Sequence, residues 1–317
     1  YVAAVCLQHD KRGGKATDEP LVGIAWAELS SGRFEAGTFA KSRIEDELER
    51  IGPAEVIYRE DDVHFSPDTT APWSWTPRPA WSFAEDSATE ALCKQLSVHN
   101  LEGFGFEATD VPAIRAAGAV LTYLQETQRT GLDHFRSLTS HRRSGFLQID
   151  AATRRSLEIT RTLRSGSREG SLLGVIDLTC TPMGSRLLAD WISAPLIDAT
   201  GINQRLDAVE MLSNETGFRA DTRKTLNQTF DLTRLLGRIA TGRTGPRDLP
   251  QAQRTLASLP LLKAQLANRQ PERLCFIDAH LHLCPELRSN LEQGLADECP
   301  LSAADGNFIR IGFDSEL

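Results

Sequence analysis

The residues that most resemble a reactive centre lie near the end of the sequence, in the stretch CFIDAHLHLC. Asp278, His280 and His282 alternate after an apolar run, and alternate side chains of a β-strand point to the same face. Two imidazoles on one face can bind one metal ion, and Cys275 and Cys284 would add thiolate ligands. The spacing therefore predicts, as one alternative, a metal-dependent hydrolase that uses His280 and His282.

The same stretch also fits a loop followed by a helix without chemistry. Only 35 residues follow His282, which is too short for the further strands of a metal-binding barrel. The whole chain has seven histidines. On the second interpretation the histidines belong to a variable part of a scaffold.

Carboxylates on the first predicted strands are candidates for a nuclease. Asp10 lies at a strand end, and Glu28 and Glu35 have ordinary charged neighbours. Three carboxylates among 43 acidic residues are weak support for catalysis. We expect these side chains to be structural.

Glycine-rich segments do not predict a nucleotide site. KRGGKATDEP and RSGSREGS both lack the GxxxxGK[ST] pattern and its strand-to-helix context. No GxSxG nucleophile motif is present either. We expect a polar loop and a flexible link, with no catalytic residue and no cofactor in this segment.

A basic cluster lies in DAATRRSLEITRTLRSG, for which helical spacing predicts one helix. Its arginines could contact phosphate, because the guanidinium group binds phosphate through two parallel hydrogen bonds. Pairing with Glu158 at helical spacing is the competing interpretation. The four candidates for phosphate contact are Arg154, Arg155, Arg161 and Arg164.

Positive and negative charges are unevenly distributed along the chain. The net charge of −8 is the sum of −9 over residues 1–116, +7 over 117–270 and −6 over 271–317. The positive stretch holds 19 arginines and two lysines. A nucleic-acid module is usually more basic than this, so pairing with Asp and Glu of the same helices is the expected use of most of these arginines.

Two domains position these candidates. Apolar β-branched runs with a Ser-Ser-Gly turn and one amphipathic helix predict a compact α/β domain over residues 1–116. Residues 61–85 hold four prolines and three tryptophans and are expected to be irregular. Helical spacing dominates from residue 117 to 317, which predicts a mostly α-helical second domain.

The most carefully specified helix is TPMGSRLLADWISAPL. Thr181 is an expected N-cap, Pro182 fits the first helical position, and Pro195 lies just beyond the end. Apolar residues form one stripe, and Arg186 and Asp190 are spaced as an i,i+4 pair. This predicts a packed core helix without chemistry.

The six cysteines are widely spaced without a CxxC pair, which predicts reduced thiols of a cytoplasmic protein, most of them small core residues. No apolar run approaches 18 residues, and no leader is visible, so no membrane partner is expected. The start at Tyr1, inside an apolar run, suggests an excerpt from a longer protein.

Several long stretches in collinear order resemble the MutS family of DNA mismatch repair proteins. They are DAATRRSLEIT, TPMGSRLLADWISAPL, YLQETQR and GRTGPRDLPQAQRTLASLP, with GIAWAELSSGRF near the start and DGNFIRIGFDSEL at the end. The resemblance covers nearly all of the chain. The stretch RQPERLCFIDAHLHLCPEL departs from the family pattern.

The resemblance implies an RNase H-like connector domain over residues 1–116 and the first part of a core or lever domain over 117–317. It implies a bacterial, cytoplasmic parent protein, associated with the nucleoid when bound to DNA. That parent would be a homodimer that recognises mismatched double-stranded DNA, couples this to ATP binding and hydrolysis, and recruits MutL. ATP and Mg would bind in an ATPase domain that is absent here, so this segment is expected to be a non-catalytic scaffold.

Overall fold

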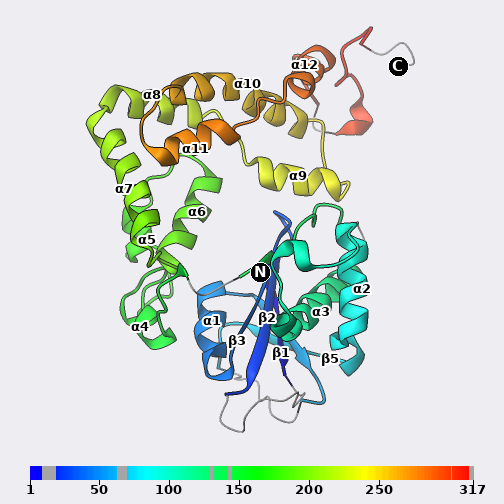
Figure 1. The fold of residues 1–317 in the computed structure, drawn as a ribbon. Helices are drawn as coiled ribbons and strands as arrows, with labels where there is room; N and C mark the ends of the chain where they lie inside the picture. Colours follow the sequence, from blue (N-terminus) through cyan, green and yellow to red (C-terminus); the bar gives the residue numbers. More distant parts are fainter. Residues whose placement is uncertain (9–18, 63–69, 129–130, 142–144, 301, 314–317) are drawn as a thin grey trace. The chain divides into compact units, whose positions relative to one another are not determined.

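The computed structural model describes residues 1–8, 19–62, 70–128, 131–141, 145–300 and 302–313. The chain divides into two compact units, coloured along the sequence in Figure 1. The first consists of residues 1–144, 148–158 and 236–242, and the second of residues 145–147, 159–235 and 243–317. The expected order, a mixed sheet with helices followed by a mostly helical part, is confirmed.

A six-stranded mixed sheet forms the centre of the first unit, in the order β5-β4-β1-β2-β3-β6. The antiparallel pairs are β1–β2 and β2–β3, whereas β1–β4, β4–β5 and β3–β6 are parallel. The strands are β1 (Val2–Leu7), β2 (Leu21–Glu28), β3 (Arg33–Ala40), β4 (Glu55–Arg59), β5 (Ser74–Arg78) and β6 (Thr139–Ser140).

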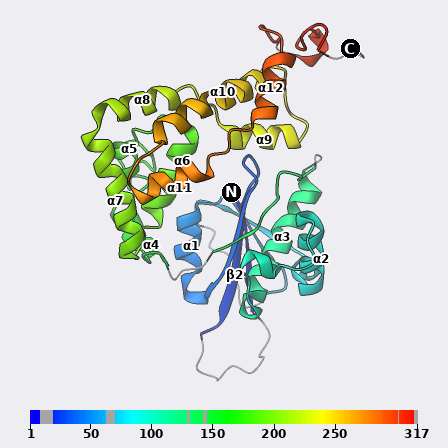
Figure 2. The ribbon, with the colours of Figure 1, turned by 45° about the horizontal axis from the view of Figure 1, so that its top comes forward.

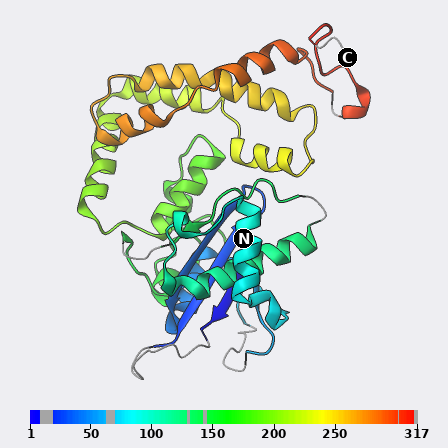
Figure 3. The same ribbon diagram turned by 45° about the vertical axis from the view of Figure 1, so that its right-hand side comes forward.

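Helices cover both faces of this sheet. On one face, Leu48 and Ile51 of α1 (Ile44–Ile51) pack with Ile24 and Trp26 of β2. On the other face lies α3 (Val111–Thr127), whose small and apolar residues pack against β1 and β2, with α2 (Glu85–Leu96) packed against α3. Figure 3 shows α2 and α3 beside the strands. Burial on both faces explains why β1 and β2 are almost continuously apolar.

Two glycines allow the close approach of α3. A Cβ on Gly23 of β2 would stand 1.9 Å from the carbonyl oxygen of Pro112, at the start of α3. A Cβ on Gly118 would stand 2.3 Å from the Cβ of Ala88 in α2. Both distances are below any real Cβ contact, so the packing depends on glycine at these positions.

The first unit extends beyond the boundary predicted at 116/117. Residue 116 lies inside α3, and that helix packs against the sheet along its length. The change to helical spacing in the sequence therefore begins within a helix of the α/β unit. Residues 61–85 are also more regular than expected, since they contain β5 and a 3-10 turn, η2 (Ala80–Phe83).

The second unit is built from helices joined by short connections, and Figure 2 shows α8, α10 and α11 lying close together. Its small buried cluster contains Ala208, Phe218 and Leu274.

The helices after α3 are α4 (Ala151–Ser156), α5 (Leu172–Ile176), α6 (Pro182–Ser193), α7 (Ala199–Asn214), α8 (Thr216–Leu226), α9 (Leu232–Ala240), α10 (Asp248–Leu266), α11 (Glu272–His280) and α12 (Pro285–Gly294). Further 3-10 turns are η1 (Lys41–Arg43), η3 (Glu102–Phe104), η4 (Ala108–Asp110) and η6 (Ala303–Asp305).

Within the described ranges, every helix is too short or too polar to cross a membrane.

Candidate functional site

The helix that carries Arg154 and Arg155 is fixed at its start. The carboxylate of Asp150 accepts a hydrogen bond from the backbone N–H of Thr153 at 2.8 Å, as an N-cap does. The carboxylate of Asp46 in α1 accepts one from the backbone N–H of Ala151 at 2.7 Å. The hydrogen bond from Ala151 to Asp46 therefore joins α4 to α1 without any contribution from the arginines.

Arg155 completes this joint. Its guanidinium lies 2.7 Å from a carboxylate oxygen of Glu45 and 2.7 Å from one of Glu49, both on α1. Hydrogen bonding to Glu49 raises the pKa of Arg155, because it favours the charged form. This guanidinium is thus already engaged within its own unit and is a poor candidate for phosphate contact.

Arg154 is buried rather than presented to solvent, with 6% of its surface exposed. Burial lowers its pKa, and the nearby charge of Arg50 lowers it further. A phosphate group could not reach this side chain without opening the contact between α1 and α4. Its placement fits a structural function.

The single helix predicted over residues 150–163 is wrong. Helix α4 ends at Ser156, and Glu158 adopts the left-handed conformation with φ of 47°. The helical spacing that would align Glu158 with Arg161 is therefore interrupted. The left-handed conformation of Glu158 ends the helical path, and the chain enters the second unit at the next residue.

Arg161 and Arg164 are the two candidates that remain accessible to phosphate. Both are exposed, and they belong to the second unit, whereas Arg154 and Arg155 belong to the first. The predicted flexible link beside them is internally hydrogen-bonded: the hydroxyls of Thr162 and Ser165 lie 2.7 Å apart, and those of Ser165 and Ser167 lie 2.8 Å apart. The four predicted arginines are thus divided between the two units.

Helix α6 begins as its sequence predicts. The hydroxyl of Thr181 accepts a hydrogen bond from the backbone N–H of Gly184 at 3.0 Å, and Pro182 occupies the first turn. The expectation of a core helix is wrong for this chain, because no residue of α6 is fully buried and Leu187 is 49% exposed. The apolar residues of α6 are therefore less buried than those of a core helix.

Asp177, between α5 and α6, gathers three partners around one carboxylate. One oxygen accepts hydrogen bonds from the backbone N–H and the hydroxyl of Thr179, at 3.0 and 2.6 Å. The other accepts one from the hydroxyl of Ser185 on α6 at 2.5 Å and pairs with Arg168. These hydrogen bonds, that of Ser185 above all, lower the pKa of Asp177 far below its ordinary value. The carboxylate fixes the turn into α6.

Asp231 makes a second joint, from α6 to the start of α9. Arg186 donates to both of its carboxylate oxygens, at 2.6 and 2.9 Å. The same carboxylate accepts a hydrogen bond from the backbone N–H of Arg234 at 3.2 Å. The hydrogen bonds from Arg186 lower the pKa of Asp231. A planar, two-point contact of this kind fixes orientation as well as distance.

The histidine motif does not have the geometry of a metal site. Asp278 and His280 lie on helix α11, not on a strand, and His282 follows the helix end, so the predicted strand is wrong. His280 stacks on the ring of Phe276 at 4.1 Å between centroids, and Nδ1 of His282 lies 3.3 Å from the sulfur of Cys284. Among the described residues, no three His, Cys, Asp or Glu side chains lie close enough to hold a metal ion.

The strand carboxylates have structural partners. Glu28 accepts hydrogen bonds from the hydroxyls of Ser30 and Ser31 in the turn after β2, at 3.1 and 2.6 Å. Glu35 pairs with Arg33 and lies 3.6 Å from Nδ1 of His141. Asp10 lies outside the described residues. These contacts stabilise the hairpin and its edge.

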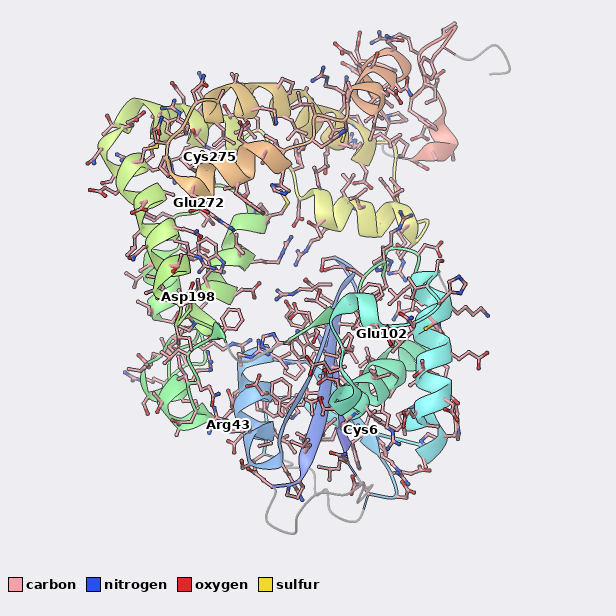
Figure 4. The ribbon with its side chains drawn as sticks, viewed as in Figure 1. Cys6, Arg43, Glu102, Asp198, Glu272 and Cys275 are labelled. Carbon is pink, nitrogen blue, oxygen red and sulfur yellow. The ribbon has the colours of Figure 1, made fainter. Side chains whose placement is uncertain are left out.

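All six cysteines are free, as expected for reduced thiols. Only Cys6 is buried, in β1, where burial raises its pKa to about 12. Cys275 on α11 is exposed, so the expectation that most cysteines are core residues is wrong. Figure 4 labels both side chains.

The sequence patterns did not identify Asp177 and Asp231 as residues whose carboxylates fix the turn into α6 and the start of α9. Each precedes a helix by a short distance, a position in which aspartate frequently caps the backbone. That signal predicts a cap but not the partner, because Arg186 is 45 residues from Asp231 in the sequence.

Fold and site together define a two-part protein, an α/β module and a helical module in which arginine–carboxylate joints fix the helices. The family model described as MutS domain II matches residues 1–136, and that described as MutS domain III matches residues 152–311. The chain belongs to the MutS family.

Curated relatives agree with this assignment. The DNA mismatch repair protein MutS of Rhodopirellula baltica is 64% identical over 327 residues, covering 100% of this chain and 37% of the relative. The protein of the same name from Salinibacter ruber is 33% identical and covers 96% of this chain and 34% of the relative. That from Syntrophomonas wolfei is 36% identical, covering 95% and 36%. The chain thus spans little more than a third of the length of these relatives.

Proposed function

We propose that this chain is the connector and the first part of the core or lever of a DNA mismatch repair protein. The first unit, including α3, would be the connector, and the second unit would begin the lever. The segment itself would have no catalytic function. The printed name of the relatives, DNA mismatch repair protein MutS, supports the parent function.

The whole protein would be a homodimer that binds mismatched double-stranded DNA, hydrolyses ATP and recruits MutL. ATP and Mg would bind outside this segment. The protein would be cytoplasmic and would associate with the nucleoid when bound to DNA. None of these activities requires a reactive group from residues 1–317.

The joint between Arg186 and Asp231 is the observation that carries the scaffold proposal. In this joint, polar side chains fix one helix relative to another rather than line a reactive centre. Coupling between distant sites travels through rigid elements with defined contacts. A lever that must transmit motion needs such joints.

Arg161 and Arg164 would contribute a smaller function, contact with nucleic-acid phosphate. Both side chains are exposed. Phosphate contact by two arginines would add affinity without sequence preference.

A comparison in the full-length protein tests the scaffold proposal. We expect Arg186→Ala to reduce the stimulation of ATP hydrolysis by mismatched DNA while ATP hydrolysis without DNA is retained. Arg234→Ala is the matched control, since its guanidinium lies 3.8 Å from the same carboxylate and is 48% exposed. Equal stimulation in wild type and Arg186→Ala would contradict the proposal.

A further inference from the structure

Two arginines of the second unit come together where helices α7 and α11 pack against each other. Arg205 lies on α7, one turn before Ala208, and Arg273 lies on α11, directly before Leu274. Ala208 and Leu274 belong to the same buried cluster. Both arginines therefore extend from the two sides of one helix contact, which Figure 2 shows within the helical unit.

Each of the two guanidinium groups lies over an aromatic ring. Cζ of Arg205 is 3.8 Å from the centroid of the Trp191 ring on α6. Cζ of Arg273 is 5.4 Å from the centroid of the Phe276 ring, one turn further along α11. Both arginine side chains are half-buried. The attraction between a cation and a ring face holds these planar groups in place, so they lose little freedom when they bind a ligand.

The positive charge of this pair is not offset by a neighbouring carboxylate. Burial lowers the pKa of Arg205, and the charge of Arg273 lowers it further. Among the described residues, no carboxylate forms an ion pair with either of them. Arg269 shows the usual arrangement, since it lies over Phe218 at 4.0 Å but also 2.7 Å from a carboxylate oxygen of Glu215. An anion between the two unpaired guanidinium groups would remove an unfavourable interaction of like charges.

We propose that Arg205 and Arg273 form a binding site for a doubly charged phosphate group, either inorganic phosphate or a terminal phosphate monoester. A guanidinium group binds phosphate through two parallel hydrogen bonds, and this pair supplies two such groups. A phosphate monoester carries about −1.5 to −2 charges at neutral pH, which matches two arginines. A phosphodiester of nucleic acid carries a single charge. The site is separate from Arg161 and Arg164 and does not depend on the function proposed above.

Titration of the complete 317-residue chain with inorganic phosphate and with ribose 5-phosphate tests the site. Calorimetry in chloride buffer of constant ionic strength gives the stoichiometry and Kd, and the NMR signal of the Trp191 indole N–H reports binding beside its ring. We expect one phosphate group per chain. Arg205→Gln and Arg273→Gln should each weaken binding about tenfold or more. Arg205→Lys should weaken it less, because lysine keeps the charge but not the paired hydrogen bonds.

Arg269→Gln is the matched control, since Arg269 also lies over a ring but is neutralised by Glu215. It should bind phosphate as the wild type does. Thermal unfolding gives a second, ligand-free comparison. In phosphate-free buffer, Arg273→Gln should not lower the midpoint, because it removes one of two like charges, whereas Arg269→Gln should lower it. Added phosphate should raise the midpoint of the wild type but not that of Arg273→Gln.

Absence of phosphate binding, or equal binding by the wild type and Arg273→Gln, would overturn the proposal. Equal weakening by Arg269→Gln would overturn it too, as would equal losses of stability in Arg273→Gln and Arg269→Gln without phosphate. Acetate, or a DNA duplex without terminal phosphates, that binds the pair as tightly as ribose 5-phosphate would exclude a doubly charged phosphate as the specific ligand. Selective binding of inorganic phosphate or of ribose 5-phosphate would support the site and identify the free ion or the monoester as its ligand.

Discussion

Arg186 of α6 and Asp231 at the start of α9 form a two-point contact, with hydrogen bonds of 2.6 and 2.9 Å between residues 45 positions apart. The side chains are 26% and 14% exposed, so the pair is shielded from solvent on most sides. A contact of this geometry fixes the direction of one helix against another. It is the clearest structural sign of what the helical unit does.

Removal of this joint should destabilise the second unit. We expect Arg186→Ala to lower the free energy of unfolding by about 1–2 kcal/mol, because it leaves a shielded carboxylate without its main partner. Urea denaturation followed by circular dichroism measures the change. Arg234→Ala should cost less than half as much, and equal losses would show that the two-point geometry is unimportant.

The carboxylate of Asp177 predicts a loss of stability in acid. Its pKa is lowered in the folded chain, so its contribution is complete above the ordinary value of 3.8 and is lost as the pH falls below that value. Asp177→Asn should therefore be less stable than wild type at neutral pH, and the difference should shrink below pH 3.8. Denaturation curves over this range measure it. A difference that is constant with pH would contradict the assignment.

The tight contact between β2 and α3 predicts a large effect of one added methyl group. Gly23→Ala would place a Cβ against the backbone of Pro112 and should cost about 1–3 kcal/mol through overpacking. Gly103→Ala is the control, because nothing lies within 4 Å of a Cβ there. Thermal unfolding of both variants should separate them clearly. Similar midpoints would mean that the sheet and α3 move apart at little cost.

The exposed arginines predict a salt-dependent effect on DNA binding by the full-length protein. Replacing Arg161 and Arg164 by alanine should lower affinity equally for matched and mismatched duplexes, and reduce the slope of log K against log salt by about 1 per arginine. Arg155→Ala should leave the slope unchanged, because Arg155 of α4 is already paired with Glu45 and Glu49 of α1. An unchanged slope in the double variant would exclude phosphate contact.

The histidine segment predicts that metal removal has no effect. Purified chain treated with a chelator should keep its midpoint of thermal unfolding, as should His280→Ala and His282→Ala. Metal analysis by mass spectrometry provides the direct check. Stoichiometric zinc that disappears in His280→Ala would restore the hydrolase alternative.

Local patterns predicted the elements whose signals are local. Apolar β-branched runs located the first strands of the sheet, and Thr181 with Pro182 located the start of α6. The edge strand β5 was missed because proline and exposed residues obscure its pattern, although its pairing with β4 organises it. Helix α4 was predicted too long, since the spacing of Arg154 and Glu158 cannot reveal that Glu158 adopts the left-handed conformation and that the chain changes unit after it.

The partners of the charged residues could not be predicted, because they depend on tertiary contacts. Arg155 binds residues more than a hundred positions earlier, and Arg186 binds Asp231 with the two helices α7 and α8 between them in the sequence. The sequence predicted that most of these arginines would pair with carboxylates of their own helices, whereas Arg155 and Arg186 pair with residues outside theirs. The apolar stripe of α6 was interpreted as part of the core because its helical spacing places the apolar residues on one face. That spacing does not show whether other residues of this chain bury the face.

An assay of ATP hydrolysis by the chain alone shows whether this segment is a scaffold without catalytic function. Purified residues 1–317 should be assayed for ATP hydrolysis with matched duplex, with mismatched duplex and without DNA. We expect turnover no greater than that of denatured protein in all three conditions. ATP hydrolysis above that background, especially if a mismatch increases it, would contradict the conclusion that this segment is a scaffold.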